Sequence, residues 1–200
     1  MGTVVSKGEK TRQRIVRKAA AVFNQRGYSG TSMSELMEET GLEKGGIYRH
    51  FESKEDLAAA AFDYAWSEIK RRRSETLDAI PNPLGKLGGM IDSFAAKPST
   101  VPGGCAIMNT AIDADDGNPL LRAHARSALR EWLDDLEGLV IEGIAQGEID
   151  PKTSAAGVAS IIIATLEGSL MMSRLTNDRA PLSAAREHLH KLLDSISKKR

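Results

Sequence analysis

The stretch TSMSELMEETGLEKGGIYRHF occupies residues 31–51 and determines the fold predicted for the start of the chain. Its first half predicts a short helix, because Ser32 and Glu35 have the spacing of a capping box. Gly41 ends that helix, since glycine takes a left-handed turn at little cost. A second short helix follows from Lys44 to about His50. Two short helices joined at a sharp turn are typical of a helix-turn-helix, whose second helix enters the major groove of DNA.

Helical spacing of apolar residues continues on both sides of this stretch. Over 9–26 the apolar residues fall on one helical face, and Gly27 ends the helix. After Ser53 a long helix is predicted to reach about Ala79, where Pro81 stops it. Further helices are predicted over 84–96, 104–114, 119–145, 153–174 and 182–197. The predicted fold is therefore all-α with about nine helices: a three-helix head over 1–54 and a helical domain over 55–200.

Charge is balanced over the whole chain but not along it. The 200 residues carry 27 Lys or Arg and 27 Asp or Glu, which argues against a chain that is basic throughout. Residues 1–54 hold 10 basic and 6 acidic residues, whereas residues 55–200 hold 17 and 21. This split predicts a polyanion-binding head on an acidic body.

The residues around the two short helices carry a family resemblance. Gly27-Tyr28, Thr31-Ser32-Met33, Glu35-Leu36, Gly41-Leu42, the run from Lys44 to Phe51 and the run from Ser53 to Leu57 closely resemble the DNA-binding head of the TetR/AcrR family of bacterial transcriptional regulators. The specific resemblance covers about residues 11–57. Beyond them only the number and length of helices are similar.

The resemblance implies which residues meet double-stranded DNA. The predicted contacts are Thr31, Ser32, Lys44, Gly45, Gly46, Tyr48, Arg49, His50 and Lys54. Lys44 and Arg49 are the candidates for reading bases, and the other side chains are candidates for contacts to the DNA backbone. Leu36, Ile47 and Phe51 are expected on the packing side of the motif.

Two residues depart from the family pattern. Glu43 stands where the family commonly has Ser or Thr, so the second helix loses its usual N-cap and gains a carboxylate near DNA. Gly46 stands where a small hydroxyl or methyl side chain is common. A glycine there permits close approach of the backbone but reads no base. These departures leave open a helical ligand-binding or interaction protein whose DNA binding has degraded.

A basic cluster precedes the helix-turn-helix. It consists of Lys10, Arg12, Arg14, Arg17 and Lys18. Part of it is expected to be contact surface and part an ordinary solvated helix face.

A palindromic operator needs two heads, so a homodimer is expected. The stretch 155–172 is apolar nearly all round, which predicts a helix covered on several sides rather than a membrane span. The family resemblance implies a four-helix bundle from the last two helices of two subunits. The predicted interface residues are Ala155, Val158, Ile162, Leu166, Leu189 and Leu193. A monomer that covers the same surface internally is the alternative.

The middle helices are expected to hold a pocket for a small-molecule inducer. Its candidate lining residues, which could equally be ordinary core, are Trp66, Met90, Phe94, Cys105, Met108, Trp132, Leu136 and Met171. Cys105 opens a predicted helix, where a thiol is more reactive, so it is either a small core residue or a sensor of electrophiles or oxidants. The acidic bias of 113–150 fits a solvated face that repels DNA better than a site for a cationic ligand.

The sequence offers no pattern for a metal site or for catalysis. His188 and His190 are two residues apart and point to different faces of a helix, and His124 is isolated, so no metal site is predicted. The sequence has no phosphate-binding glycine loop and no nucleophile elbow, so neither an enzyme nor a cofactor is expected. The favoured function is a cytoplasmic, ligand-responsive DNA-binding regulator, with repression favoured over activation and no membrane partner.

Overall fold

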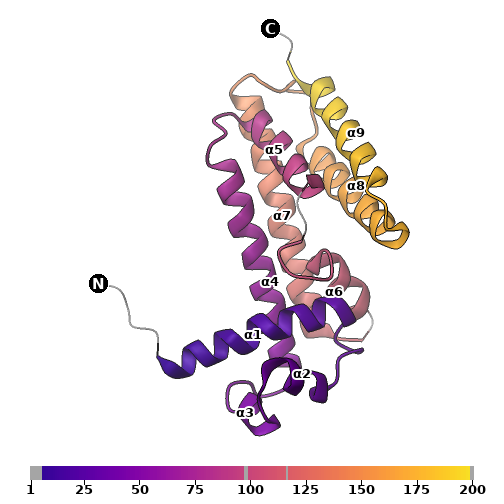
Figure 1. The fold of residues 1–200 in the computed structure, drawn as a ribbon. Coiled ribbons are helices and arrows are strands. Elements are labelled where there is room, and N and C mark those ends of the chain that lie inside the picture. Colours follow the sequence, from indigo (N-terminus) through magenta and orange to yellow (C-terminus); the bar gives the residue numbers. More distant parts are fainter. Residues whose placement is uncertain (1–5, 97–98, 116, 199–200) are drawn as a thin grey trace. The chain divides into compact units, whose positions relative to one another are not determined.

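The computed structural model describes residues 6–96, 99–115 and 117–198, and in these residues it contains nine α-helices (Figure 1). They are α1 (Lys7–Arg26), α2 (Met33–Thr40), α3 (Lys44–Tyr48), α4 (Lys54–Leu77), α5 (Pro83–Ala96), α6 (Ala106–Ala114), α7 (Pro119–Ala145), α8 (Ala155–Thr176) and α9 (Ala180–Ile196). The all-α prediction is confirmed. The only β-type pairing in the described part of the chain is an isolated bridge between Ile149 and Ser197.

The chain divides into two compact units. The first is Met1–Ile69 with Ser99–Ala128, and the second is Lys70–Pro98 with Leu129–Arg200. The first unit is thus larger than the head expected over 1–54. It is larger because the loop before α6, and α6 itself, are hydrogen-bonded to the end of α1.

The first unit is built on α1, which packs against α2 and α6 (Figure 1). Ile15, Leu36 and Leu57 are fully buried in its core. The predicted capping box is present at the start of α2, with the Ser32 hydroxyl accepting from the Glu35 N–H at 3.2 Å. Gly41 ends α2 with a φ of 67°, in the left-handed region that favours glycine.

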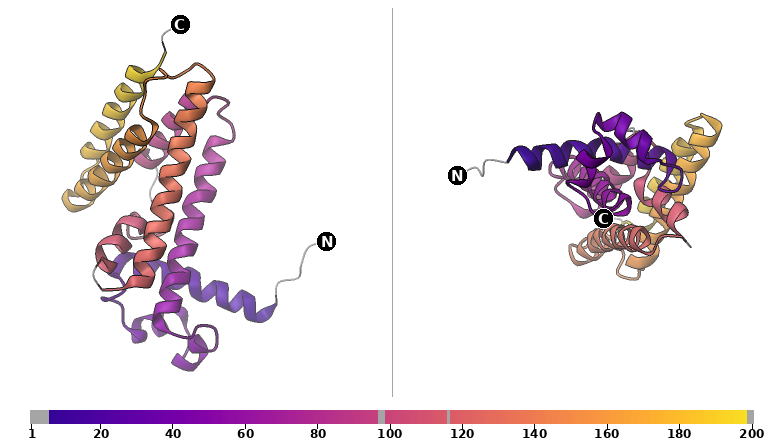
Figure 2. Two further views of the ribbon diagram at one scale, coloured as in Figure 1. Left: turned by 180° about the vertical axis from the view of Figure 1, so that it is seen from behind. Right: turned by 90° about the horizontal axis from the view of Figure 1, so that it is seen from below.

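In the second unit α8 and α9 run side by side, and both pack against α5 (Figures 1 and 2). Two ion pairs join the end of α4 to α7: Lys70 Nζ lies 2.7 Å from Glu131 Oε1, and Arg73 Nη2 lies 2.7 Å from Asp135 Oδ2. Burial lowers the pKa of Arg73, although Asp135 and Glu131 oppose that shift.

The helix α8 is covered on one side only. Ile162 and Leu166 are buried, whereas Ile161, Met171 and Leu175 are 47%, 44% and 80% exposed. By length and mean hydropathy α8 could cross a membrane, and a third of its apolar window is buried. The same test is passed by core helices of soluble proteins, so a single helix of this kind is weak evidence for a membrane protein.

Candidate nucleic-acid interface

The segment from α3 to the start of α4 has a buried side and an exposed side. Ile47 and Phe51 are 1% and 2% exposed, and Leu36 of α2 is fully buried beside them in the core, as predicted for the packing side. Lys44 and Arg49 are exposed, and Tyr48 is an exposed large aromatic residue. Charged and aromatic side chains therefore gather on the side of α3 that leaves the core.

Lys44 and Tyr48 are one helical turn apart and interact. The Lys44 ammonium lies 5.8 Å from the centre of the Tyr48 ring, which is within the range of a cation–π interaction. At the start of α3 the Glu43 side chain makes no capping hydrogen bond, so the loss of the usual cap that the sequence predicts is confirmed. Both α3 glycines are open: a Cβ at Gly45 would meet nothing within 4 Å, and one at Gly46 would meet only Leu42, at 3.5 Å.

Two of the predicted backbone contacts are engaged inside the chain. Thr31 is 2% exposed and its hydroxyl donates to the Gly27 carbonyl at 2.7 Å, so its side chain cannot reach a phosphate. The prediction for the Thr31 side chain is therefore wrong, because the hydroxyl closes the turn between α1 and α2. The Ser32 hydroxyl is exposed but is occupied by the capping box.

Lys54 also serves the turn between α1 and α2. Its ammonium donates to the Tyr28 carbonyl at 2.6 Å and lies 4.2 Å from the centre of the Tyr28 ring. Burial lowers the pKa of Lys54, and the nearby Asp113 carboxylate opposes that shift. Burial raises the pKa of Tyr28, and Glu55 and Tyr48 add to the rise. Only the remaining N–H groups of Lys54 are available to a phosphate.

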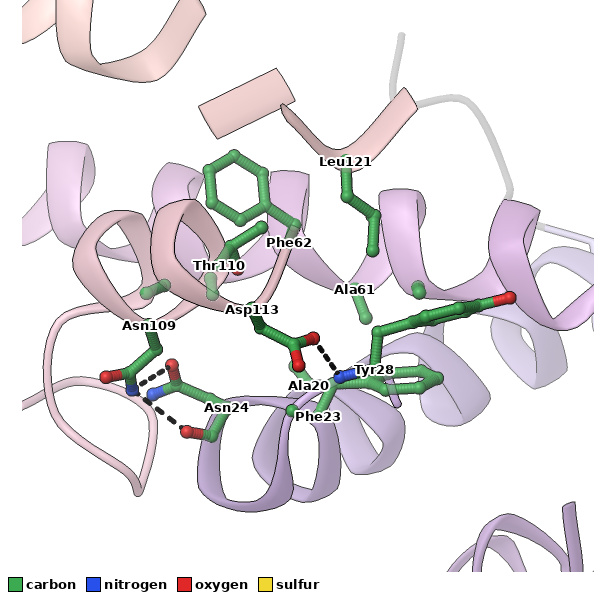
Figure 3. Close-up of a pocket in the computed structure, with 14 residues that line it drawn as sticks. Ala20, Phe23, Asn24, Tyr28, Ala61, Phe62, Asn109, Thr110, Asp113 and Leu121 are labelled. Atoms are coloured by element: carbon green, nitrogen blue, oxygen red, sulfur yellow. Dashed lines mark hydrogen bonds between the residues drawn. The ribbon is translucent and has the colours of Figure 1, made fainter. Parts of the chain in front are cut away.

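The same turn is held from α6 (Figure 3). The Asp113 carboxylate accepts from the Tyr28 N–H at 2.6 Å. The Asn109 amide donates to the Asn24 carbonyl at 2.9 Å and to the Asn24 Oδ1 at 3.0 Å. We call these contacts, made by Asn24, Tyr28, Asn109 and Asp113, the α1–α6 latch.

The loop before α6 belongs to this arrangement. The Asn24 amide donates to the Pro102 and Gly104 carbonyls at 2.9 and 3.1 Å, and the Asn109 amide also donates to the Gly103 carbonyl at 2.9 Å. Gly103 has a φ of 117°, and a Cβ there would collide with the Asn24 backbone. Sequence reasoning missed the latch. The one local signal for the latch is the Gly103-Gly104 pair, because two consecutive glycines indicate a loop whose backbone conformation other residues rarely adopt.

A cavity of about 30 Å³ lies beside the latch and is lined by Phe62, Leu121 and the latch residues (Figure 3). This volume corresponds to about one water molecule. The cavity is therefore too small for an organic inducer.

The predicted pocket residues have different environments. Trp66, Met90, Cys105, Trp132 and Leu136 are buried, and Phe94 stacks on Trp132 with their ring centres 5.9 Å apart. Met108 is partly buried on α6. Met171 is 44% exposed on the outer face of α8 and points away from the core, so it cannot line an internal pocket of its own unit. Cys105 is the N-cap residue of α6, and its burial does not favour a sensor of dissolved oxidants.

The predicted interface residues lie largely inside the chain. Val158, Ile162, Leu166, Leu189 and Leu193 are at most 5% exposed. Ala155 is partly exposed at the first turn of α8. The five buried residues are covered by the packing of α5, α8 and α9 on one another and belong to the core of their own unit. The apolar surface available on α8 is its opposite face.

Two of the four histidines each contact one carboxylate. His124 Nδ1 lies 2.7 Å from Asp63 Oδ1, and His190 Nε2 lies 2.7 Å from Asp92 Oδ1. Among residues 6–96, 99–115 and 117–198, no group of three His, Cys, Asp or Glu residues could hold a metal ion.

Two family models match the chain. The model described as "Bacterial regulatory proteins, tetR family" matches residues 15–61, and the model "Tetracyclin repressor-like, C-terminal domain" matches residues 83–189. The first match contains α2, α3 and the start of α4, and the second contains α6 and its half of the latch.

Individual proteins agree with these matches. The chain is 30% identical to the HTH-type transcriptional repressor DhaR of Mycobacterium sp. (strain GP1), with 86% of each chain covered. It is 45% identical to a TetR transcriptional regulator from Chloroflexus aurantiacus J-10-FL, whose crystal structure matches with a TM-score of 0.92 over 97% of this chain and 99% of that one. It is 36% identical to a TetR-family regulator from Cytophaga hutchinsonii, with a TM-score of 0.93 over 99% and 100% of the two chains.

Members of this family are transcriptional regulators and not enzymes. The exposed side of α3, the nine helices of the described residues and the two family matches agree along the chain. The chain therefore belongs to the TetR family of helix-turn-helix transcriptional regulators.

Proposed function

We propose that this regulator represses transcription by binding a palindromic operator as a homodimer, and that a small-molecule inducer releases it. The observation that carries the proposal is the exposed side of α3, where Lys44, Tyr48 and Arg49 leave the core together. A relative covering most of the chain, DhaR, is itself named a repressor. Such a protein works in the cytoplasm, where its DNA is.

The dimer is supported by the outer face of α8. Ile161, Ala164, Gly168, Met171 and Leu175 are spaced three to four residues apart along it, so they form one stripe. A Cβ at Gly168 would meet nothing within 4 Å, so a second helix could approach closely there. Because Leu175 is 80% exposed, contact with a second copy would remove a large apolar side chain from water.

Release is a shift between two populations. In the DNA-binding state two recognition helices lie about 34–36 Å apart, one turn of the double helix, or a multiple of that distance. An inducer that binds the other state more tightly moves the population away from this spacing. The α1–α6 latch supports this mechanism, because α6 belongs to the C-terminal family match while its hydrogen bonds hold the turn before α2.

Binding of the purified protein to the DNA upstream of its own gene tests the proposal. We expect a retarded complex whose affinity falls steeply with salt and exceeds that for unrelated DNA. Binding without sequence preference, or with a flat response to salt, would refute repression at an operator. It would then favour a helical ligand-binding protein with degraded DNA binding.

A further inference from the structure

The helix α3 has little stability of its own. An isolated helix shorter than about 12 residues is marginal in water, and α3 has five. Gly45 and Gly46 lower its helix propensity further, and the Glu43 side chain does not cap its N-terminus. Apart from the buried Ile47 side chain, the position of α3 must therefore be held by contacts to the segments on either side of it.

The end of α2, which leads into α3, has an unfavourable charge pattern. Its last turn contains Glu38 and Glu39 and no basic residue, although the negative end of a helix dipole favours cations. Lys18 of α1 supplies the missing charge, since its ammonium donates to the Glu39 carbonyl and lies 3.9 Å from Glu39 Oε1. Gly41 makes its left-handed turn two residues later. Lys18 thus fixes the point from which the chain turns towards α3.

The chain that leaves α3 is held from the same helix. Phe51 is 2% exposed and comes three residues after the end of α3. The Arg12 guanidinium lies 4.9 Å from the centre of the Phe51 ring, which is within the range of a cation–π interaction. Arg12 and Lys18 are both partly buried, and their contacts lie after and before α3 respectively.

We propose that Arg12 and Lys18 are positioning residues for DNA binding. From α1 they hold the two segments that flank α3, and so they set the orientation in which α3 meets DNA. Their cations are engaged inside the chain, and they act on DNA only through α3. The inference needs a DNA-binding α3, and it is independent of the proposed inducer and of repression.

A positioning residue and a phosphate contact differ in their effects on binding. Loss of a phosphate contact weakens binding to every sequence and makes the slope of log K against log salt shallower by about 0.9 per head. Loss of a positioning residue misplaces α3, so it weakens the reading of bases and leaves non-specific binding intact. A residue with a purely structural role would lower the thermal stability and leave the affinity of the folded protein unchanged.

The test compares Lys18→Met and Arg12→Leu with Arg126→Met, a control that removes one exposed cation of α7. Each full-length protein is titrated by fluorescence anisotropy, well below its Tm, against the DNA upstream of its own gene and against an unrelated duplex, at several salt concentrations. Circular dichroism verifies that each variant is folded. A double-mutant cycle adds Arg12→Leu to Phe51→Leu, which lacks the ring but keeps an apolar side chain at this buried site.

We expect Lys18→Met and Arg12→Leu each to lose at least about fivefold in affinity for the upstream duplex. Their affinity for the unrelated duplex, and its salt slope, should match wild type. The control Arg126→Met should match wild type on both duplexes. Once Phe51 is leucine, Arg12→Leu should cost less than about twofold, because the ring that it contacts is gone.

Equal losses on the two duplexes, or a shallower salt slope on the unrelated one, would make these residues phosphate contacts and overturn the inference. Unchanged affinity for the upstream duplex in both variants would overturn it as well. For Arg12, so would an equal loss with and without the Phe51 ring. Failure of wild type to prefer the upstream duplex would refute the proposed function alone, and the variants would then be compared on a duplex that the wild type selects from random sequence.

Discussion

Replacing Gly46 by alanine should make the protein more stable and a weaker DNA binder at the same time. In α3 the new methyl group would meet only the Leu42 side chain, at 3.5 Å from its Cβ and 3.8 Å from its Cδ2, and both are ordinary van der Waals contacts. Gly46 has no positive φ, so alanine fits its backbone without strain. The free protein therefore has no structural need for glycine at this position.

The gain in stability follows from helix propensity. Glycine in a helix interior is about 0.8–1.0 kcal/mol less favourable than alanine. For a chain of this length, about 1 kcal/mol corresponds to a rise of about 2–4 °C in Tm. The loss in binding follows if the α3 backbone approaches DNA closely at Gly46. A methyl group forced into a well-packed contact costs about 1–3 kcal/mol, which is about 5- to 150-fold in Kd.

Thermal unfolding and fluorescence anisotropy with the upstream operator measure the two effects. Gly138→Ala in α7 is the matched control, because that exposed helical glycine also has nothing within 4 Å of an added Cβ. It should gain similar stability and bind DNA as wild type does. If Gly46→Ala were more stable and bound DNA unchanged, glycine would not be there for close approach. A lower Tm would refute the steric reasoning itself.

Three further changes test other parts of the molecule. Asn109→Ala removes the amide group that donates to Asn24 and to the Gly103 carbonyl, and should lower the free energy of unfolding by about 1–3 kcal/mol in urea titrations; a change below about 0.5 kcal/mol would contradict the latch. Leu175→Glu should shift sedimentation from dimer to monomer, whereas Leu120→Glu, also at an exposed leucine, should leave it unchanged. Burial raises the pKa of Asp92, but hydrogen bonds from His190 and Arg186 outweigh it and leave that pKa lowered, so their stabilisation is present above about pH 4 and is lost as the pH falls further. Asp92→Asn should accordingly make acid unfolding, followed by circular dichroism, less steep; an unchanged acid transition would argue against this contact.

Local signals account for what the sequence predicts of the DNA-binding head. The Ser32–Glu35 capping box, the left-handed Gly41 and the apolar spacing of α1 each involve residues within one or two helical turns. Such signals identify the elements and their buried sides, including Ile47. They do not reveal side-chain partners, and Thr31 is the example. A threonine before a helix is equally suited to contact DNA or to close the preceding turn, and only the fold assigns its hydroxyl to Gly27.

Periodicity fails where a helix is apolar on every side. In α8 both Ile161 and Ile162 fit a buried position, and the sequence cannot tell which one the chain covers itself. The structure buries Ile162 under its own helices and exposes Ile161. The interface residues predicted on α8 therefore lie mostly on the face that the chain covers itself. The α1–α6 latch escapes prediction for another reason, because Asn24 and Asn109 are 85 residues apart and single polar contacts have no period.

In the mechanism proposed above, the latch would also couple α6 to DNA binding in both directions. The Tyr28 N–H donates to Asp113 of α6, and the Tyr28 carbonyl accepts from Lys54 of α4. Helix α2 begins only five residues later, at Met33. A movement of α6 by about 1 Å would stretch the 2.6 Å hydrogen bond between the Tyr28 N–H and Asp113 beyond hydrogen-bonding distance. Under the proposed function, an inducer that moves α6 would lower the affinity for DNA by some factor. Because linkage requires the same factor in both directions, operator DNA that fixes the turn must lower the affinity for inducer equally.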